Sequence, residues 1–535
     1  MRRSLLVLLL SVGVCLFATA STLATGPGGW NRLGTDGTPS GASLNGHVTA
    51  LNADTPGALY VGGSFTNAGG IASADRIAKW DGTKWSALGT TPLGTGSVFA
   101  IATYAGKVYA GGTFVNAGGQ AAADYLAVFD GVSWKPFCNS TTRPAFDAAA
   151  LQVLALQVVG STLYVGGTFQ NANSDRRADY LIACDLATGT PSVTVDTDGD
   201  FTGPVYDLAA TPDGTLYAGG TFTNLDHVAT ADRVASYNGT TWQGLGTTAI
   251  GGIVRALHAQ GTDVYISSDG VNIGGVAQAD HLVKWNGSGF SAVGANGAGT
   301  DGYFPATTYI NALTSSGSLL FAAGSWQNAD GKSTGDVVAS FDGSKWRPIG
   351  SNGANDGPWV GDTQALEVFG GQLYAGGAMT NAGGDRKANF ATSRSLRLPD
   401  ALIATATGGY VGDDVYNKTA VGQTKTIQIA RGSSSYLPIT IQNEGLLPAS
   451  FRLKGTGAAT GYTVTYVNYY NGANITTAVR NGSFSTGILA PGQSFAMKII
   501  VKLSASAATT GAFVLTARST AGTPADAVRG VVRAT

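Results

Sequence analysis

LYVGGSFTNAGGIASADRIAKWDGTKWSALG, residues 59–89, is one copy of a unit that recurs along this chain of 535 residues. A pentapeptide of the LYVGG type starts seven times, at Leu59, Val108, Leu163, Leu216, Val264, Leu320 and Leu373, with spacings of 49, 55, 53, 48, 56 and 53 residues. An Asn stands eight residues after each start, and an Asp stands sixteen residues after all but the last. A regular period of this length indicates an array of small structural units.

Each copy has the pattern of four short strands, as in residues 98–104, 107–114, 125–129 and 133–137. An Asp-Gly or Asn-Gly pair usually precedes the fourth strand, which is a hairpin signal. Four strands in about 50 residues predict a seven-bladed β-propeller. Only six copies are followed by a fourth strand, of the W-x-x-L-G type or a degenerate form of it with a weak example at residues 192–195, and Trp30-Asn31-Arg32-Leu33-Gly34 precedes the first copy. We therefore predict that the N-terminal strand completes the last blade and closes the ring.

The composition agrees with an all-β chain. Charged residues are only 12%, Gly occurs 78 times, and of the 33 acidic residues only Glu367 and Glu444 are Glu. Asp favours turns and Glu favours helices, so this imbalance indicates many turns. The formal net charge is -1 and no basic run follows Arg2 and Arg3. The electrostatic signature of a nucleic-acid-binding protein is therefore absent.

The first 25 residues have the pattern of a secretory signal. Arg2 and Arg3 precede an apolar run over residues 5–17, and small residues follow at Ala18, Ala20 and Ala24. The apolar run is too short to span a bilayer, and no later segment is long and apolar enough to do so. We expect an exported protein, secreted or at the cell surface, with the propeller over residues 26–398.

From residue 399 the repeat stops and a different strand pattern begins. The predicted strands cover residues 424–430, 436–443, 450–454, 462–467, 494–503, 513–518 and 528–533. Seven such strands predict an immunoglobulin-like β-sandwich over residues 399–535. The N-E-G-x-x-P-x-x-F stretch (residues 443–451) and the A-P-G-Q-S stretch (residues 490–494) resemble sandwich modules that follow catalytic or binding domains in secreted bacterial proteins.

Over residues 30–396 the repeats resemble Kelch-type propellers, such as the central domain of galactose oxidase. They are also similar to the F-x-N-A-G-G and W-D-G-x-x-W repeats of secreted bacterial surface proteins and of fungal cortical polarity marker proteins. This resemblance implies a fold more than an activity. The only histidines are His47, His227, His258 and His281, and none lies in the C-terminal domain. The chain therefore departs from a copper radical oxidase, and we do not expect that activity.

The repeated Asn and Asp are expected to cap turns, because a group that every copy needs normally serves the fold. Functional residues are sought where the copies differ, in the long loops on one face of the disc. There we predict a ligand-binding surface with the exposed aromatic residues Phe201, Tyr303, Phe304 and Trp359, which could stack on a sugar or a peptide. The alternative is that these rings pack beneath the loops.

The innermost strands place a second group of polar residues near the axis. We expect Arg255, His258, Asn311, Gln364 and Glu367 to line a central channel, either as a binding site or as a solvated polar plug.

Two further features could carry chemistry. Asp196, Asp198 and Asp200 alternate like the start of a calcium-binding loop, although an acidic turn is the simpler interpretation. Cys138 and Cys184 occupy adjacent copies, so a disulfide is conceivable and two buried thiols are the alternative.

These observations favour a secreted or cell-surface binding or scaffold protein with a protein or glycan partner. One alternative is a carbohydrate-active hydrolase or lyase that uses Asp residues on the loop face, and another is a purely structural spacer. No zinc-binding His pair, Cys-x-x-Cys or phosphate-binding loop is present, which favours binding over catalysis.

Overall fold

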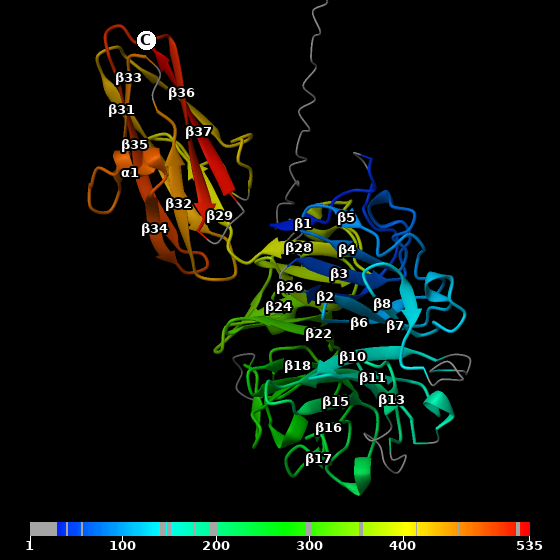
Figure 1. Cartoon of the computed structure of the whole chain (residues 1–535). Coiled ribbons are helices and arrows are strands. Elements are labelled where there is room, and N and C mark those ends of the chain that lie inside the picture. Colours follow the sequence, from blue (N-terminus) through cyan, green and yellow to red (C-terminus); the bar gives the residue numbers. More distant parts are fainter. Residues whose placement is uncertain are drawn as a thin grey trace, which may run out of the picture.

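The computed structural model describes residues 29–38, 41–54, 57–139, 146, 151–175, 177–192, 201–295, 302–351, 357–413, 415–457, 460–520 and 525–535. The expected signal segment, residues 1–25, lies outside the described residues. The described chain is all-β, as the sequence predicts, and its strands form nine separate sheets (Figure 1).

Seven sheets have four strands each and follow the repeats in order. The first three comprise β2 (Val48–Asp54), β3 (Ala58–Gly63), β4 (Ile77–Trp80) and β5 (Trp85–Ser86); β6 (Val98–Tyr104), β7 (Lys107–Gly112), β8 (Leu126–Phe129) and β9 (Trp134–Pro136); and β10 (Val153–Val159), β11 (Thr162–Gly167), β12 (Leu181–Asp185) and β13 (Pro191–Ser192). The fourth and fifth comprise β14 (Val205–Ala210), β15 (Leu216–Gly220), β16 (Val234–Tyr237) and β17 (Trp242–Gly244); and β18 (Val254–Gln260), β19 (Asp263–Ser268), β20 (Leu282–Trp285) and β21 (Phe290–Ala292). The sixth comprises β22 (Tyr309–Ser316), β23 (Leu319–Ser325), β24 (Val338–Phe341) and β25 (Trp346–Pro348), and the seventh β26 (Thr363–Phe369), β27 (Gln372–Gly377), β28 (Ala391–Ser395) and β1 (Trp30–Arg32).

The N-terminal strand β1 supplies the outer strand of the seventh sheet. It pairs antiparallel with β28, with Trp30 opposite Arg394 and Arg32 opposite Thr392. In Figure 1 the blue β1 lies beside the yellow β28 at the two ends of the repeat region. The prediction that residues near Trp30 provide the missing fourth strand is confirmed.

The repeats predicted a closed seven-bladed propeller, and this prediction is corrected: the structure has separate antiparallel sheets. Among the described residues, hydrogen-bonded ladders join strands within a sheet, no ladder links one of the seven sheets to the next, and no sheet closes on itself. The sheets meet through side-chain packing. The first strand of each sheet, here called its inner strand, contacts the inner strand of the next sheet, in the order β2, β6, β10, β14, β18, β22 and β26, and β26 contacts β2.

The repeated Asn and Asp shape the connection between the second and third strands of each sheet. Asn67 has a left-handed backbone (φ 53°), and its N–H donates to Asp75 Oδ1 over 2.7 Å. Asn is among the few residues that adopt this conformation readily, which explains why it recurs there. The equivalent 3-10 turns are η1 (Ala68–Gly70), η2 (Ala117–Gly119), η3 (Ala172–Ser174), η4 (Leu225–His227), η5 (Ile273–Gly275), η6 (Ala329–Gly331) and η7 (Ala382–Gly384). The structural role predicted for these residues is confirmed.

The remaining two sheets form an immunoglobulin-like sandwich whose core lies between them. One sheet has the order β29 (Pro399–Ile403), β31 (Ser434–Asn443), β35 (Ser494–Leu503) and β33 (Tyr462–Asn468). The other has the order β30 (Thr424–Ile429), β37 (Ala525–Ala534), β36 (Thr510–Ser519), β32 (Ala449–Gly455) and β34 (Phe484–Leu489), with β30 and β37 parallel. The helix α1 (Thr476–Asn481) and the strands β29 and β34 were not predicted.

Candidate functional site

A cavity of about 520 Å³ lies where the seven inner strands meet. Every inner strand contributes three consecutive residues to its wall, and β26 contributes Glu367 as a fourth. We call it the axial cavity. Its volume is typical of a site for a small molecule.

The three wall positions differ in how strongly they vary among the copies. The third position is always Leu or Ile, and the second is Ala in six copies and Asp207 in the fourth. The first position differs in every copy, and these seven residues are here called the variable ring. In chain order they are Thr49, Phe99, Leu154, Tyr206, Arg255, Asn311 and Gln364.

The variable ring divides into two continuous arcs. Phe99, Leu154 and Tyr206 come from three successive sheets and form an apolar arc. The other four residues come from the fifth, sixth, seventh and first sheets, which also follow one another, and form a polar arc of Arg255, Asn311, Gln364 and Thr49. Such a division suits a ligand with one polar and one apolar side.

A register shift in each inner strand coincides with the residue of the variable ring. In each inner strand the pairing register with the second strand shifts at this residue, for example between Val48 and Ala50. An extra residue at a bulge is unpaired and its side chain is re-aimed. Val48 and Val98, which precede the shift, are buried, whereas Thr49 and Phe99 are half-buried at the cavity wall.

Arg255 is held in place by residues in which the fifth copy departs from the repeat. Most copies have Gly-Gly followed by Ser or Thr at the end of the second strand, and the fifth has Ser267-Ser268-Asp269. In the first copy the Ser64 hydroxyl accepts the N–H of His47 over 3.1 Å. In the fifth, Asp269 Oδ1 accepts the equivalent N–H of Ile253 over 2.5 Å.

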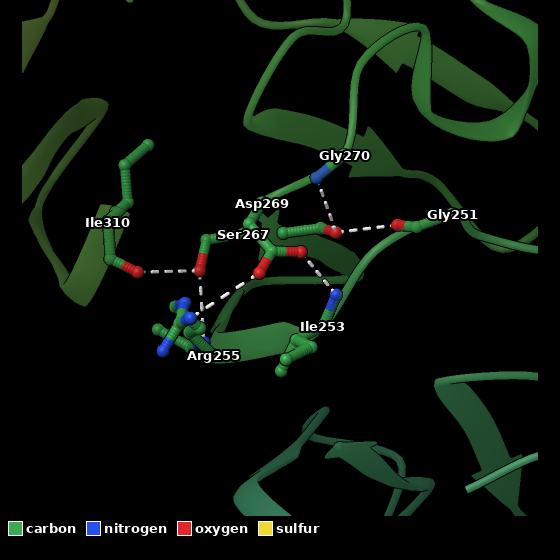
Figure 2. Close-up of polar contacts among 9 residues, drawn as sticks. Gly251, Ile253, Arg255, Ser267, Asp269, Gly270 and Ile310 are labelled. Carbon is green, nitrogen blue, oxygen red and sulfur yellow. Dashed lines mark hydrogen bonds and ion pairs between the residues drawn. The ribbon is translucent and has the colours of Figure 1, made fainter. Parts of the chain in front are cut away.

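The substitution of a carboxylate for a hydroxyl leaves a second oxygen available. Asp269 Oδ2 lies 3.4 Å from Arg255 Nη2, and the guanidinium carbon lies 4.4 Å from the centroid of the Tyr309 ring. Figure 2 shows the carboxylate of Asp269 between Ile253 and Arg255. An ion pair and a cation–π contact therefore orient the one cation of the variable ring.

Two carboxyl groups face the axial cavity. Asp207 accepts the backbone N–H of Leu208 over 2.8 Å and that of Leu257 over 2.7 Å. Burial raises the pKa of Asp207 to about 7, against these hydrogen bonds, and burial likewise raises the pKa of Glu367 to about 7. Both groups therefore change charge near neutral pH.

Four of the five predicted channel residues, Arg255, Asn311, Gln364 and Glu367, line the axial cavity. His258 does not: its Nε2 lies 2.8 Å from the Ser315 hydroxyl, and burial lowers its pKa to about 4. Sequence reasoning missed Asp207, although an alignment of the inner strands shows it as the exception among alanines.

The predicted aromatic surface is corrected, because the four rings are buried. Their exposed fractions are 3% for Phe201, 4% for Tyr303, 6% for Phe304 and 3% for Trp359. Each packs against a Trp of an outer strand: Phe201 on Trp242, Tyr303 and Phe304 on Trp346, and Trp359 on Trp30. Large apolar rings are more stable in such clusters than in water, so the loops fold back over the sheets.

Tyr303 and Phe304 also border a second cavity of about 700 Å³ between the fifth and sixth sheets. His281 lies in its wall and is 2% exposed. Burial lowers the pKa of His281 and raises that of Tyr303 to about 12, so both groups are neutral at neutral pH.

A disulfide joins Cys138 and Cys184, whose Cα atoms are 5.5 Å apart, and so links the second and third sheets. Most other copies have Gly at the first position and an aromatic residue at the second: a Cβ added to Gly89 would lie 3.2 Å from the Phe129 ring. With Cys184 in place of the large ring, there is space for a side chain at residue 138. From the sequence, a disulfide and two buried thiols were left as alternatives. The signal that distinguishes them was the replacement of both residues, Gly by Cys138 and an aromatic residue by Cys184, in adjacent copies.

The possible calcium residues Asp196, Asp198 and Asp200 lie outside the described residues. Across the described ranges, no group of three or more His, Cys, Asp or Glu is arranged to hold a metal ion. In the same part of the chain, no helix combines the length and apolar character needed to cross a bilayer.

No protein-family model matches the chain, and no curated protein matches it. Similar solved structures include a family 123 glycoside hydrolase from Clostridium perfringens, 10% identical, with a TM-score of 0.19 over 26% of this chain and 27% of that one. A PapD-like domain of human CEP192 is 10% identical, with a TM-score of 0.16 over 25% of this chain and 85% of that one. The VesB protease of Vibrio cholerae is 10% identical, with a TM-score of 0.14 over 72% of this chain and 90% of that one.

TM-scores this low carry no argument about fold or function. The resemblance to Kelch-type, galactose oxidase-like and cortical polarity marker repeats is corrected, because no family model supports it and the described strands form separate antiparallel sheets, none of which is closed. The repeats set the strand pattern of this chain and do not identify a family.

Proposed function

We propose that this chain is an exported binding protein whose site is the axial cavity. The observation that carries the proposal is the variable ring: seven equivalent positions differ in every copy and divide into a polar and an apolar arc. The neighbouring wall positions are nearly uniform, so the variation is confined to the variable ring. The signal-like sequence of residues 1–25 supports export.

The arrangement of the seven sheets around the cavity belongs to this proposal. The contacts of the inner strands run from β2 through β26 and back to β2, which supports a radial array of sheets about the cavity. In such an array one ligand meets residues from every copy. A protein or glycan bound on the long loops is less favoured, because the aromatic rings expected there are buried.

The proposal is tested by blocking the cavity. The exported full-length chain is screened by native mass spectrometry against small molecules that have one polar and one apolar side. The double variant Asn311→Trp/Gln364→Trp fills the polar arc and is expected to abolish binding of any hit. Val132→Trp is the matched control, because Val132 is 79% exposed and lies on a hairpin away from the cavity.

Equal binding by the blocked variant and the wild type would contradict the axial site. Circular dichroism of both variants checks that the fold is retained. Sequencing of the exported protein's N-terminus is expected to begin near residue 26, and an intact residue 1 would contradict export by cleavage of the signal.

A further inference from the structure

The second wall position of the axial cavity departs from Ala in one copy only. Ala50, Ala100, Ala155, Ala256, Ala312 and Ala365 occupy it in six copies, and Asp207 occupies it in the fourth. A buried carboxylate costs free energy that an alanine does not. Packing in the other six copies shows that the fold does not need a carboxylate at this position.

Asp207 keeps acceptor capacity for a ligand. Its Oδ1 accepts the Leu208 N–H and its Oδ2 accepts the Leu257 N–H, at 2.8 and 2.7 Å. A carboxylate oxygen has two lone pairs, so each can accept one more hydrogen bond. The two backbone bonds hold the group rigidly at the wall.

The charges around the cavity favour a cation. In the described part of the chain, no Lys or Arg nitrogen forms an ion pair with Asp207 or Glu367. The one Arg at the wall, Arg255, is paired with Asp269. The ionised wall is therefore net negative. An anionic ligand would meet two carboxylates there, and a neutral one would leave both without a counter-charge.

The apolar arc begins beside Asp207. Tyr206 precedes it in the chain, and Leu154 and Phe99 follow on the next two sheets. Aromatic faces attract organic cations, and Leu154 adds aliphatic surface. A carboxylate next to aromatic and aliphatic surface matches an ammonium group attached to an apolar body.

We propose that the axial cavity binds a small organic ammonium ion with an apolar body, with Asp207 as acceptor for the ammonium group and Phe99, Leu154 and Tyr206 as the surface for the body. The proposal rests on the function proposed above and specifies its ligand class.

Three probes with the same ring and different charge test the proposal: phenethylamine, 2-phenylethanol and 3-phenylpropionate. Their affinities for the exported full-length chain are measured by isothermal titration calorimetry at pH 8. Phenethylamine is expected to bind at least about tenfold more tightly than 2-phenylethanol, because its hydrogen bond to Asp207 is between charged groups. 3-Phenylpropionate is expected to bind most weakly.

The variant Asp207→Asn keeps the size of the side chain and removes its charge. It is expected to lose about tenfold or more in phenethylamine affinity and clearly less in 2-phenylethanol affinity, because the alcohol carries no charge to pair with the carboxylate. Asp213→Asn is the matched control, because Asp213 accepts the Thr211 hydroxyl and the Thr215 N–H in the hairpin of the same sheet. Its probe affinities are expected to equal those of the wild type.

Different failures are distinguishable. Equal binding of amine and alcohol, preference for the carboxylate, or an unchanged amine affinity in Asp207→Asn would overturn the ligand class. If the alcohol still binds and Asn311→Trp/Gln364→Trp blocks it, the axial site stands without the ammonium. Binding of none of the probes at millimolar concentration would overturn the ligand class, and only the wider screen described above would then decide the axial site.

Discussion

Individual side chains give the axial cavity its chemistry where one copy departs from the others. Asp207 stands where the other copies have an alanine. Asp269 stands where most copies have a serine or threonine, and its Oδ2 forms an ion pair with Arg255 Nη2 at 3.4 Å. Residues that recur in all copies, such as Asn67 and Asp75, serve turns. In a repeat protein the shared residues stabilise the sheets, and the exceptions are free to serve a ligand.

The ionisation of Asp207 predicts a dependence of stability on pH. Its pKa is raised from 3.8 to about 7 in the folded chain, so the folded state binds the proton more tightly than the unfolded state. This group therefore lowers the free energy of unfolding as the pH rises from about 4 to about 7, and the loss is complete above that range. The pKa of Glu367 is raised as well, and Glu367 is present in both the wild type and the Asp207→Asn variant that are compared below.

Asp207→Asn removes this contribution. The melting temperature of the variant minus that of the wild type is expected to be larger at pH 8 than at pH 5. Thermal unfolding of both proteins at both pH values measures this difference. Asp213→Asn, whose native carboxylate has a lowered pKa because of its bond to Thr211, is not expected to show this pattern. The same relative melting temperature at both pH values would contradict the assignment.

The short strand β1 holds together distant parts of the chain. It has three residues and pairs with a strand more than 350 residues later, so it joins the two ends of the repeat region. Trp30 is 0% exposed, donates its Nε1–H to the Ile349 carbonyl over 3.3 Å, and packs on Trp359 at a centroid distance of 4.8 Å. Trp85 and Trp346 make equivalent bonds to Leu33 and Val293.

The variant Trp30→Ala is expected to lower the free energy of unfolding by about 3 to 5 kcal/mol, because it leaves a cavity in a buried cluster. Chemical denaturation measures the change. Val132→Ala serves as the control, since Val132 is 79% exposed and its truncation exposes no new cavity. A loss below about 1 kcal/mol in Trp30→Ala would mean that β1 does not hold the seventh sheet together.

In the assembled chain, the seven sheets depend on packing between neighbours, because no hydrogen-bonded ladder connects them within the described ranges. The disulfide between Cys138 and Cys184 is the covalent link across one of these boundaries, and it closes a loop with a sequence separation of 46. A covalent link of this length restricts the unfolded chain more than the folded one.

The double variant Cys138→Ala/Cys184→Ala is expected to lower the free energy of unfolding by about 4 kcal/mol on the chain-entropy relation. Chemical denaturation of the variant and of the wild type with and without reductant measures this. Reductant is expected to destabilise the wild type and to leave the variant unchanged. A wild type that reductant does not affect, despite loss of the bridge by thiol assay, would contradict a stabilising role.

Periodicity alone was enough to place most strands. The strands predicted at residues 98–104 and 494–503 agree with β6 and β35 at both ends, because their hydrophobic patterns are bounded by clear turn signals. The strand β34, with alternating exposed positions over Phe484–Leu489, and the short helix α1 have weak local patterns and were missed. The pairing of β1 with β28 was predictable because a motif missing at one end was present at the other.

Burial and assembly depended on contacts between distant residues. The sequence identified Phe201, Tyr303, Phe304 and Trp359 as aromatic residues in loops, but their positions beneath those loops depend on Trp residues of outer strands. Likewise, Asp is an ordinary turn-forming residue, and Asp207 became a cavity residue only because the seven inner strands meet at the cavity. Local patterns specify strands and turns because they act over a few residues. The cavity required tertiary structure because each of its walls comes from a different repeat.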